Sequence, residues 1–334
     1  MKRVILSLLT IALALTSAEA AKWRVNNRTG VNANFTTVAA AITAATAGDT
    51  IYVEPSATSY DYSVTIDKRL VIIGNGFFDY PAATLVNNPG LQADTNKSVL
   101  TYVYFNAGSA GSVMMGMSLS GGYTIVADTS ITLRRNAYTQ SQLYVDADKV
   151  DIRQNLFYYC GISHYYNNTH SNINIQNNLF YYYASINIPS GFSAFIQNNL
   201  FDQNSSMNCW ASQVNNNIMV SGSSFTANNS VFFNNIGDGT QFPNTGNGSN
   251  NLQSITTTAL FTNYASGTET RYTLNPTGPG IGAGFNSVDC GIFGGPDPYK
   301  LSGIPPFPTI YSLSAPNTTT SSTLPVTIST RSND

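Results

Sequence analysis

An Asn residue followed by two apolar residues recurs along the middle of this chain. The copies begin at Asn155, Asn178, Asn199, Asn217, Asn235 and Asn251, and the successive spacings are 23, 21, 18, 18 and 16 residues. Repeats of this length are typical of a solenoid, in which each copy forms one coil that stacks on its neighbours. Tyr-rich, β-prone segments flank the copies, which favours strands over helices.

The Asn residues have a physical role in such an array. Coils of a parallel solenoid lie about 4.8 Å apart, so equivalent Asn side chains stack and can hydrogen-bond as a ladder. Asn also tolerates the left-handed backbone that a tight corner needs. The two apolar positions form a Leu/Ile column starting at Leu156 and a Phe/Met column starting at Phe157. At least one column must line the interior, and the sequence leaves open which.

The first 20 residues predict export. Lys2 and Arg3 precede an apolar run over 4–15, and Ala18-Glu-Ala20 ends it, as in a secretory signal peptide. We therefore expect a signal peptide over 1–20 and a secreted or cell-surface protein, extracellular or periplasmic. No second hydrophobic segment follows, so no membrane span is expected after cleavage. The net charge of −2 gives no basic excess, which argues against a nucleic-acid partner.

The segment before the repeats carries a resemblance to a known family. An Ala-rich segment over 35–47 predicts a short helix ending at Gly48. Strand-like stretches follow at 49–53, 65–66 and 70–73. Together with the closing Gly-rich segment over 252–294, these resemble secreted right-handed parallel β-helix proteins of the pectate-lyase-like superfamily. The resemblance implies that the helix caps the solenoid and that residues 252–300 form a closing coil.

The expected architecture is thus all-β. We predict a right-handed parallel β-helix (solenoid) over 21–300, with a short N-terminal capping α-helix and an extended Pro/Thr/Ser-rich C-terminal tail over 301–334. The tail is either a mobile extension or a segment that docks on the solenoid or a partner, and 324–330 could form a terminal strand. We expect a monomer. The odd set of Cys160, Cys209 and Cys290 predicts buried thiols rather than a disulfide framework.

Catalytic motifs of that superfamily are missing. Its hydrolases carry clustered Asp residues, and its lyases use Arg or Lys with calcium-binding carboxylates. Over 154–237 the only charged residue is Asp202. We therefore assign no catalytic residue, metal or cofactor. The alternative is a polysaccharide lyase or glycoside hydrolase with an unusual site. One candidate site is the acidic cluster over 146–151 with Arg153, where carboxylates could bind calcium. The other is an acid–base pair formed by His164 or His170 with Tyr166.

Tyr residues repeat beside the Asn positions. Tyr158 and Tyr159 lie three and four residues past Asn155, and Tyr181 and Tyr182 lie at the same offsets from Asn178. Asp202 and Gln203 hold these two places in the next coil. One Tyr column should face outward, extended by His164 and Tyr166, and sugar rings pack on such surfaces. The alternative is purely structural stacking. We therefore expect an exported, non-enzymatic β-helix protein that binds polysaccharide, surface glycan or a partner through Tyr159, Tyr182, His164, Tyr166 and Asp202.

Overall fold

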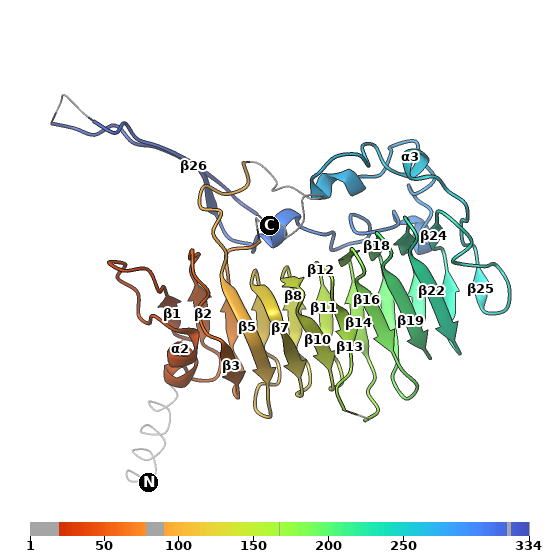
Figure 1. The fold of residues 1–334 in the computed structure, drawn as a ribbon, viewed down its shortest axis with the longest axis horizontal. Helices are drawn as coiled ribbons and strands as arrows, with labels where there is room; N and C mark the ends of the chain where they lie inside the picture. Colours follow the sequence, from red (N-terminus) through yellow and green to blue (C-terminus); the bar gives the residue numbers. More distant parts are fainter. Residues whose placement is uncertain (1–19, 78–89, 167, 319–321, 334) are drawn as a thin grey trace, which may run out of the picture.

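The computed structural model describes residues 20–77, 90–166, 168–318 and 322–333. They form a right-handed parallel β-helix (Figure 1), which confirms the predicted fold class. Strands stack into an 11-stranded sheet and a 14-stranded sheet, and coil neighbours pair in parallel. In the described part of the chain, no helix is long and apolar enough to cross a membrane.

The 11-stranded sheet forms one face of the solenoid. Its strands, in order, are β1 (Lys22–Val25), β2 (Thr50–Val53), β4 (Val71–Ile73), β6 (Val113–Met115), β8 (Thr132–Arg134), β11 (Asp151–Arg153), β14 (Ile173–Gln176), β17 (Ala194–Gln197), β20 (Gln213–Asn215), β23 (Val231–Phe233) and β25 (Gly248–Ser249).

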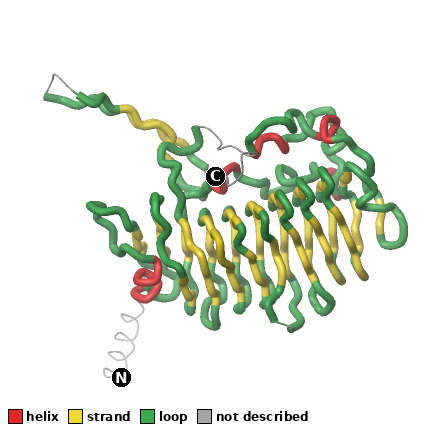
Figure 2. Tube along the Cα trace, viewed as in Figure 1, coloured by secondary structure: helices red, strands yellow, loops and turns green. Residues whose placement is uncertain are grey.

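The 14-stranded sheet has two arms that share the long strand β7, and each arm forms a further face. Figure 2 shows the strands of successive coils stacked side by side in yellow. One arm, the outer arm, contains β3 (Ser63–Ile66), β5 (Val99–Phe105), β7 (Ser118–Val126), β10 (Gln142–Val145), β13 (Gly161–Ser163), β16 (Ser185–Ile188), β19 (Ser206–Trp210) and β22 (Ser224–Asn228). The other, the covered arm, contains β9 (Ala137–Thr139), β12 (Leu156–Tyr158), β15 (Leu179–Tyr181), β18 (Leu200–Asp202), β21 (Ile218–Met219) and β24 (Ile236–Gly237).

The predicted Asn ladder is present at the corner between the first face and the covered arm. Asn178 Nδ2 donates to Asn199 Oδ1 at 3.0 Å and to the carbonyl of Ile152 at 2.9 Å. Its Oδ1 accepts from the Asn155 backbone N at 2.9 Å and from Asn155 Nδ2 at 3.0 Å. The same pattern continues through Asn217 and Asn235. Each buried amide is thereby fully paired, which is what burial of a polar group demands.

The two apolar columns divide between two cores. Phe157, Phe180 and Phe201 point inward, and their rings stack with centroids 4.9 and 4.6 Å apart. Leu156 and Leu179 point outward from the same strands and are nevertheless buried. Alternation along a strand sends neighbours to opposite faces, so a second layer has to cover the Leu column.

Residues 252–304, which we call the C-terminal cover, supply that layer. They contain α3 (Thr257–Leu260), η1 (Glu269–Tyr272), η2 (Phe285–Ser287) and η3 (Leu301–Gly303). Leu260, Phe261 and Ile292 of this segment join the Leu column in one buried cluster. The predicted closing coil is therefore wrong: this segment runs back along the solenoid instead of adding a coil (Figure 1).

The cover is held by the residue that precedes each ladder Asn. These residues, among them Gln154, Asn177 and Asn234, have φ of 59°, 54° and 55°. The left-handed corner turns their side chains outward, where they donate to backbone carbonyls of the cover. Asn177 Nδ2 reaches Ile292 and Gly294 at 2.9 and 2.8 Å, Asn234 Nδ2 reaches Ala283 at 2.8 Å, and Gln154 Nε2 reaches Pro298 at 2.7 Å. In the Asn-Asn pairs from 177–178 to 234–235, one Asn thus stacks the coils and the other anchors the cover.

A short helix closes the N-terminal end, as predicted. It is α2 (Val38–Ala44), with Thr37 as N-cap and with Val38, Ala41 and Ile42 buried against the core. Lys68 Nζ donates to the carbonyls of Ile42 and Ala45 at 3.1 and 3.3 Å. A cation here satisfies carbonyls at the helix C-terminus.

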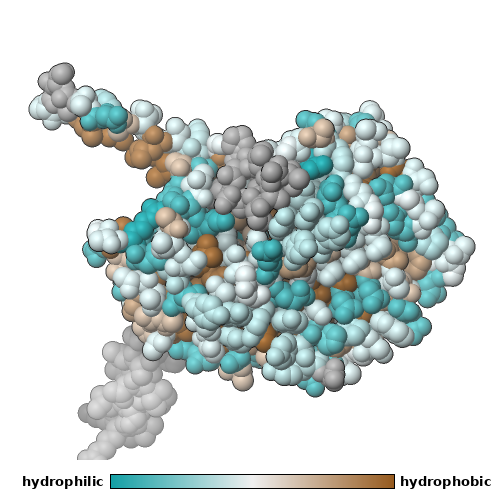
Figure 3. Space-filling view, in the orientation of Figure 1, coloured by the Kyte–Doolittle hydropathy of each residue, from teal (hydrophilic) through white to brown (hydrophobic). Residues whose placement is uncertain are grey.

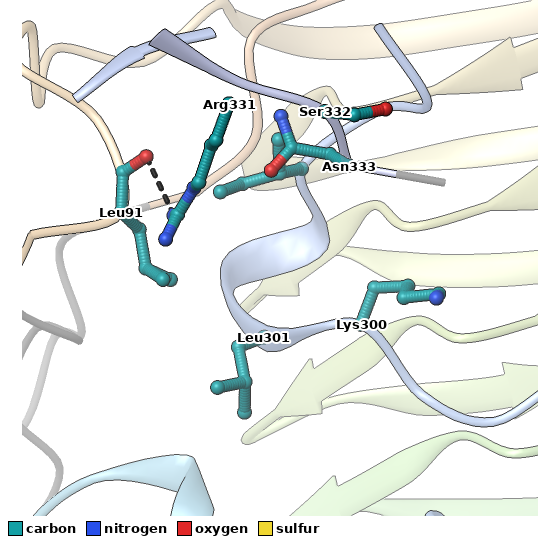
Figure 4. Close-up of a pocket in the computed structure, with 7 residues that line it drawn as sticks. Leu91, Lys300, Leu301, Arg331, Ser332 and Asn333 are labelled. Atoms are coloured by element: carbon teal, nitrogen blue, oxygen red, sulfur yellow. Dashed lines mark hydrogen bonds between the residues drawn. The ribbon is translucent and has the colours of Figure 1, made fainter. Parts of the chain in front are cut away.

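The tail ends in an antiparallel hairpin that projects from the body (Figure 1). Its strands are β26 (Thr309–Ser314) and β27 (Thr327–Arg331), so the suggested terminal strand exists. The hairpin exposes several apolar side chains, visible in brown in Figure 3. At its base, Arg331 Nη2 donates to the Leu91 carbonyl at 2.7 Å beside a hollow of about 240 Å³ (Figure 4).

Candidate functional site

The charged cluster around Arg153 is internally paired. Arg153 forms ion pairs with Asp151 and, at 3.0 Å between Nη1 and Oδ2, with Asp297 of the cover. Neighbouring Asp146 accepts backbone N–H groups of Tyr165 and Tyr166 at 2.9–3.1 Å. Among the described residues, no group of three His, Cys, Asp or Glu side chains could hold a metal. The positive charge of Arg153 is therefore paired with the carboxylates of Asp151 and Asp297.

The two His residues lie elsewhere. His164 follows β13 on the outer arm, whereas Arg153 lies on β11 of the 11-stranded sheet. The rings of His164 and His170 both pack on Phe192, with centroid distances of 5.4 and 5.3 Å. His170 Nδ1 is 3.7 Å from Asp148 Oδ1, beside an open hollow of about 480 Å³. His164 and Arg153 thus lie on different faces of the solenoid and do not form one acid–base site.

Tyr159, Tyr182 and Tyr183 form a cluster at the corner between the covered and outer arms. All three have positive φ, between 54° and 57°. The Tyr159 ring lies 5.8 Å from Tyr182 and 5.9 Å from Tyr183. Tyr159 and Tyr183 are about half exposed, and Tyr182 is partly buried because it stacks on Tyr158 at 5.6 Å. We call these three the corner tyrosines.

Asp202 lies beneath the cover and has no exposed surface. Its carboxylate accepts the hydroxyls of Tyr264 and Tyr272 at 2.6 and 2.8 Å. Burial, followed by the nearby Asp202 charge, raises the pKa of both phenols above their ordinary value. The guanidinium of Arg271 stacks 4.3 Å from the centre of the Tyr264 ring. Asp202 therefore anchors the cover. It is the only charged residue over 154–237, and this isolation is the sequence signal that indicates a specific structural role.

A longer Tyr array, which sequence reasoning missed, crosses the outer arm. We call it the Tyr diagonal; its members are Tyr62, Tyr102, Tyr123, Tyr144 and Tyr165. Successive ring centroids are 4.9, 4.7, 5.9 and 5.3 Å apart. From Tyr102 onward the residues lie 21 positions apart. Tyr102 and Tyr123 are direct partners in the β5–β7 register, whereas β10 pairs Gln142 with Tyr123 and β13 pairs Ser163 with Tyr144. From Tyr123 onward, a step of 21 therefore moves each ring one outward place along the strand.

The ends of the diagonal are open to solvent. Tyr62 is 73% exposed and Tyr165 is 53% exposed, and Tyr166 packs on Tyr165 at 5.0 Å. Tyr104 adds a ring beside Tyr123, and its hydroxyl lies 3.0 Å from the Tyr123 hydroxyl. This hydrogen bond, with burial as a smaller contribution, raises the pKa of Tyr104 to about 12. Tyr104 is therefore a neutral phenol at any physiological pH.

The outward strand positions of the outer arm carry no charged side chain. Outward positions of the outer arm, from β3 to β22, hold Ser63, Thr65, Tyr102, Tyr104, Tyr123, Ile125, Gln142, Tyr144, Gly161, Ser163, Ser185, Asn187, Ser206, Asn208, Trp210, Ser224, Thr226 and Asn228. Hydroxyls and amides that both donate and accept therefore surround a run of aromatic rings that meet edge to face. Such a surface suits a ligand rich in hydroxyl groups and poor in charge.

Comparison of this chain with known protein families, with curated proteins and with solved structures found no match.

Proposed function

We propose that the chain is an exported, non-enzymatic β-helix protein that binds a polysaccharide or surface glycan along the Tyr diagonal. The observation that carries the proposal is the run of partly exposed rings, in edge-to-face contact with one another, on a hydroxyl- and amide-rich face whose outward strand positions are uncharged. The diagonal crosses five coils, and their rise of about 4.8 Å per coil makes it roughly 19 Å long. That length suits an extended chain ligand better than a single small molecule.

The predicted contact residues take different places in this proposal. Tyr166 and His164 lie beside Tyr165, at one end of the diagonal. Tyr159 and Tyr182, among the corner tyrosines, provide a second aromatic surface. Asp202 supports the cover and contributes no contact, because it is fully buried.

The alternative function, a polysaccharide lyase or glycoside hydrolase, has less support. Its candidate groups divide between faces: Arg153 pairs with Asp151 and Asp297 on one sheet, and His164 packs on Phe192 beyond another. General acid–base chemistry needs these groups within hydrogen-bond reach of one reacting atom.

The test is a glycan array or polysaccharide pull-down with two double variants. We expect Tyr123→Ala/Tyr144→Ala to weaken binding at least about fivefold, since each aromatic contact contributes roughly 0.5–1.5 kcal/mol. Tyr159→Ala/Tyr182→Ala measures the corner tyrosines in the same assay, and Tyr311→Ala in the hairpin is the matched control. Unchanged binding by the folded Tyr123/Tyr144 variant would refute the diagonal as the site.

A further inference from the structure

A pocket of about 450 Å³ lies at the N-terminal end of the solenoid, on the 11-stranded sheet. We call it the N-terminal pocket. Lys22 and Arg24 of β1, Tyr52 of β2, and Glu54 line it, and Phe307 of the tail closes one side. Its volume falls within the range of small-molecule sites. It lies on a different sheet from the Tyr diagonal, so it goes beyond the proposed function.

Aromatic side chains form the apolar part of the pocket. Register pairs Arg24 with Tyr52, so both side chains leave the sheet on its outer side. The Phe307 ring meets Tyr52 edge to face, with 6.5 Å between centroids and 75° between planes. Two rings at this angle leave a corner into which the flat face or edge of a third ring packs favourably.

Most polar groups of the pocket are already paired with one another. Arg24 Nε donates to Glu54 Oε1 at 2.5 Å, and Asn26 Nδ2 donates to Glu54 Oε2 at 2.7 Å. Asn75 Nδ2 donates to the carbonyl of Asn96 at 2.5 Å. The Arg24–Glu54 pair is neutral as a unit, so it adds no net charge to the pocket.

Two polar groups remain available to a ligand. The Lys22 side chain is exposed and makes no hydrogen bond or ion pair with any described residue, which leaves its ammonium as one uncompensated positive charge. Gln92 Oε1 is buried and accepts no hydrogen bond within the described chain. A buried amide oxygen without a donor is costly to leave unpaired. The pocket thus presents an aromatic corner, one cation and one open acceptor.

We propose that the N-terminal pocket binds a small aromatic carboxylate that also carries a hydrogen-bond donor such as a phenolic hydroxyl. The ring packs against Tyr52 and Phe307, the carboxylate pairs with Lys22, and the hydroxyl donates to Gln92 Oε1. A single negative charge matches the single unpaired cation, whereas a dianion would exceed it.

Three probes separate these contributions in ligand-observed NMR and calorimetry on the protein. 4-Hydroxybenzoate carries all three features, benzoate lacks the hydroxyl, and 4-hydroxybenzamide lacks the charge. We expect 4-hydroxybenzoate to bind most tightly, and each of the others to bind several-fold to about tenfold more weakly. A wild-type protein that binds none of the probes, or binds all three equally, overturns the proposal.

Variants locate the site. Lys22→Gln should remove the preference for 4-hydroxybenzoate over its amide, whereas Lys149→Gln, an exposed lysine on another coil, should leave it unchanged. Phe307→Ala should weaken all three probes, and Phe307→Leu tests the same wall with less disturbance of the tail. Tyr123→Ala on the diagonal should have no effect. If Tyr123→Ala abolishes probe binding and Lys22→Gln does not, the probe sits on the diagonal and the pocket assignment is wrong.

Discussion

Replacing one residue of the Asn ladder should destabilise the whole middle of the solenoid. Asn178→Ala removes four buried hydrogen bonds: two donated by its Nδ2 and two accepted by its Oδ1. Three buried groups then lose a partner, namely the Ile152 carbonyl, the Asn155 backbone N–H and one Asn155 Nδ2–H. At about 1–3 kcal/mol for each orphaned group, the expected loss is roughly 3–9 kcal/mol.

Urea unfolding followed by circular dichroism measures this loss. The matched control is Asn208→Ala, since Asn208 is exposed and its side chain donates, among the described residues, only to Asn187 on the surface. We expect that control to stay within about 0.5 kcal/mol of wild type. Asn178→Asp keeps the shape of the side chain, yet it cannot donate and buries a charge, so it should be at least as destabilised as Asn178→Ala.

The result that refutes this reasoning is a cost for Asn178→Ala within 1 kcal/mol of the Asn208→Ala control. Such a result would mean that water or relaxation of the corner replaces the lost bonds. The ladder would then be a consequence of coil stacking and not one of its causes.

Three further predictions concern other parts of the chain. Asp49 is buried and accepts from Trp23 Nε1 at 3.0 Å and from the Thr46 N–H at 2.9 Å; the Thr46 and Trp23 hydrogen bonds lower its pKa. Its contribution to stability should therefore be complete above the unfolded value of about 3.9 and lost as the pH falls through the lower folded value, and Asp49→Asn should flatten the acid limb of a thermal-melt series. Asn177→Ala should loosen the C-terminal cover, seen as faster amide exchange and proteolysis within 283–304 with the coils still protected; protection equal to wild type would contradict its anchoring role. Burial raises the pKa of Cys160 to about 12, so iodoacetamide should leave this thiol unmodified at pH 8 until urea unfolds the chain; fast labelling of the native protein would exclude a buried thiol.

The repeat was sufficient to predict the coils, because the stacking of Asn178 on Asn155 depends only on periodicity and on the needs of a buried amide. The sidedness of the columns was not predictable. It depends on the left-handed corner at Gln154 and its equivalents, which sends Phe157 inward and Leu156 outward. A sequence pattern shows that side chains alternate between the two faces of a strand. It does not show which face points to the core, because that depends on the backbone conformation at the preceding corner.

The cover and the site were harder to predict for a different reason. Residues 252–304 have no repeat, so their docking rests on side chains far away in sequence, such as Asn177. That docking buried Asp202, which had been expected at the edge of an exposed strip. The Tyr diagonal was visible as a 21-residue spacing from Tyr102 to Tyr165, yet it steps along the strand and so does not follow the columns that the Asn ladder defines.

The length of the C-terminal cover matches a fixed number of coils. Its carbonyls meet successive corners in order, from Ala283 at Asn234 to Ile304 at Arg135, with Ile292 at Asn177 between them. Solenoids change length readily when a repeat is duplicated or lost, because each coil contacts only its neighbours. Here a gained or lost coil would put every later corner out of step with the cover. The number of coils is thus specified twice, once in the repeats and once in the segment that spans them.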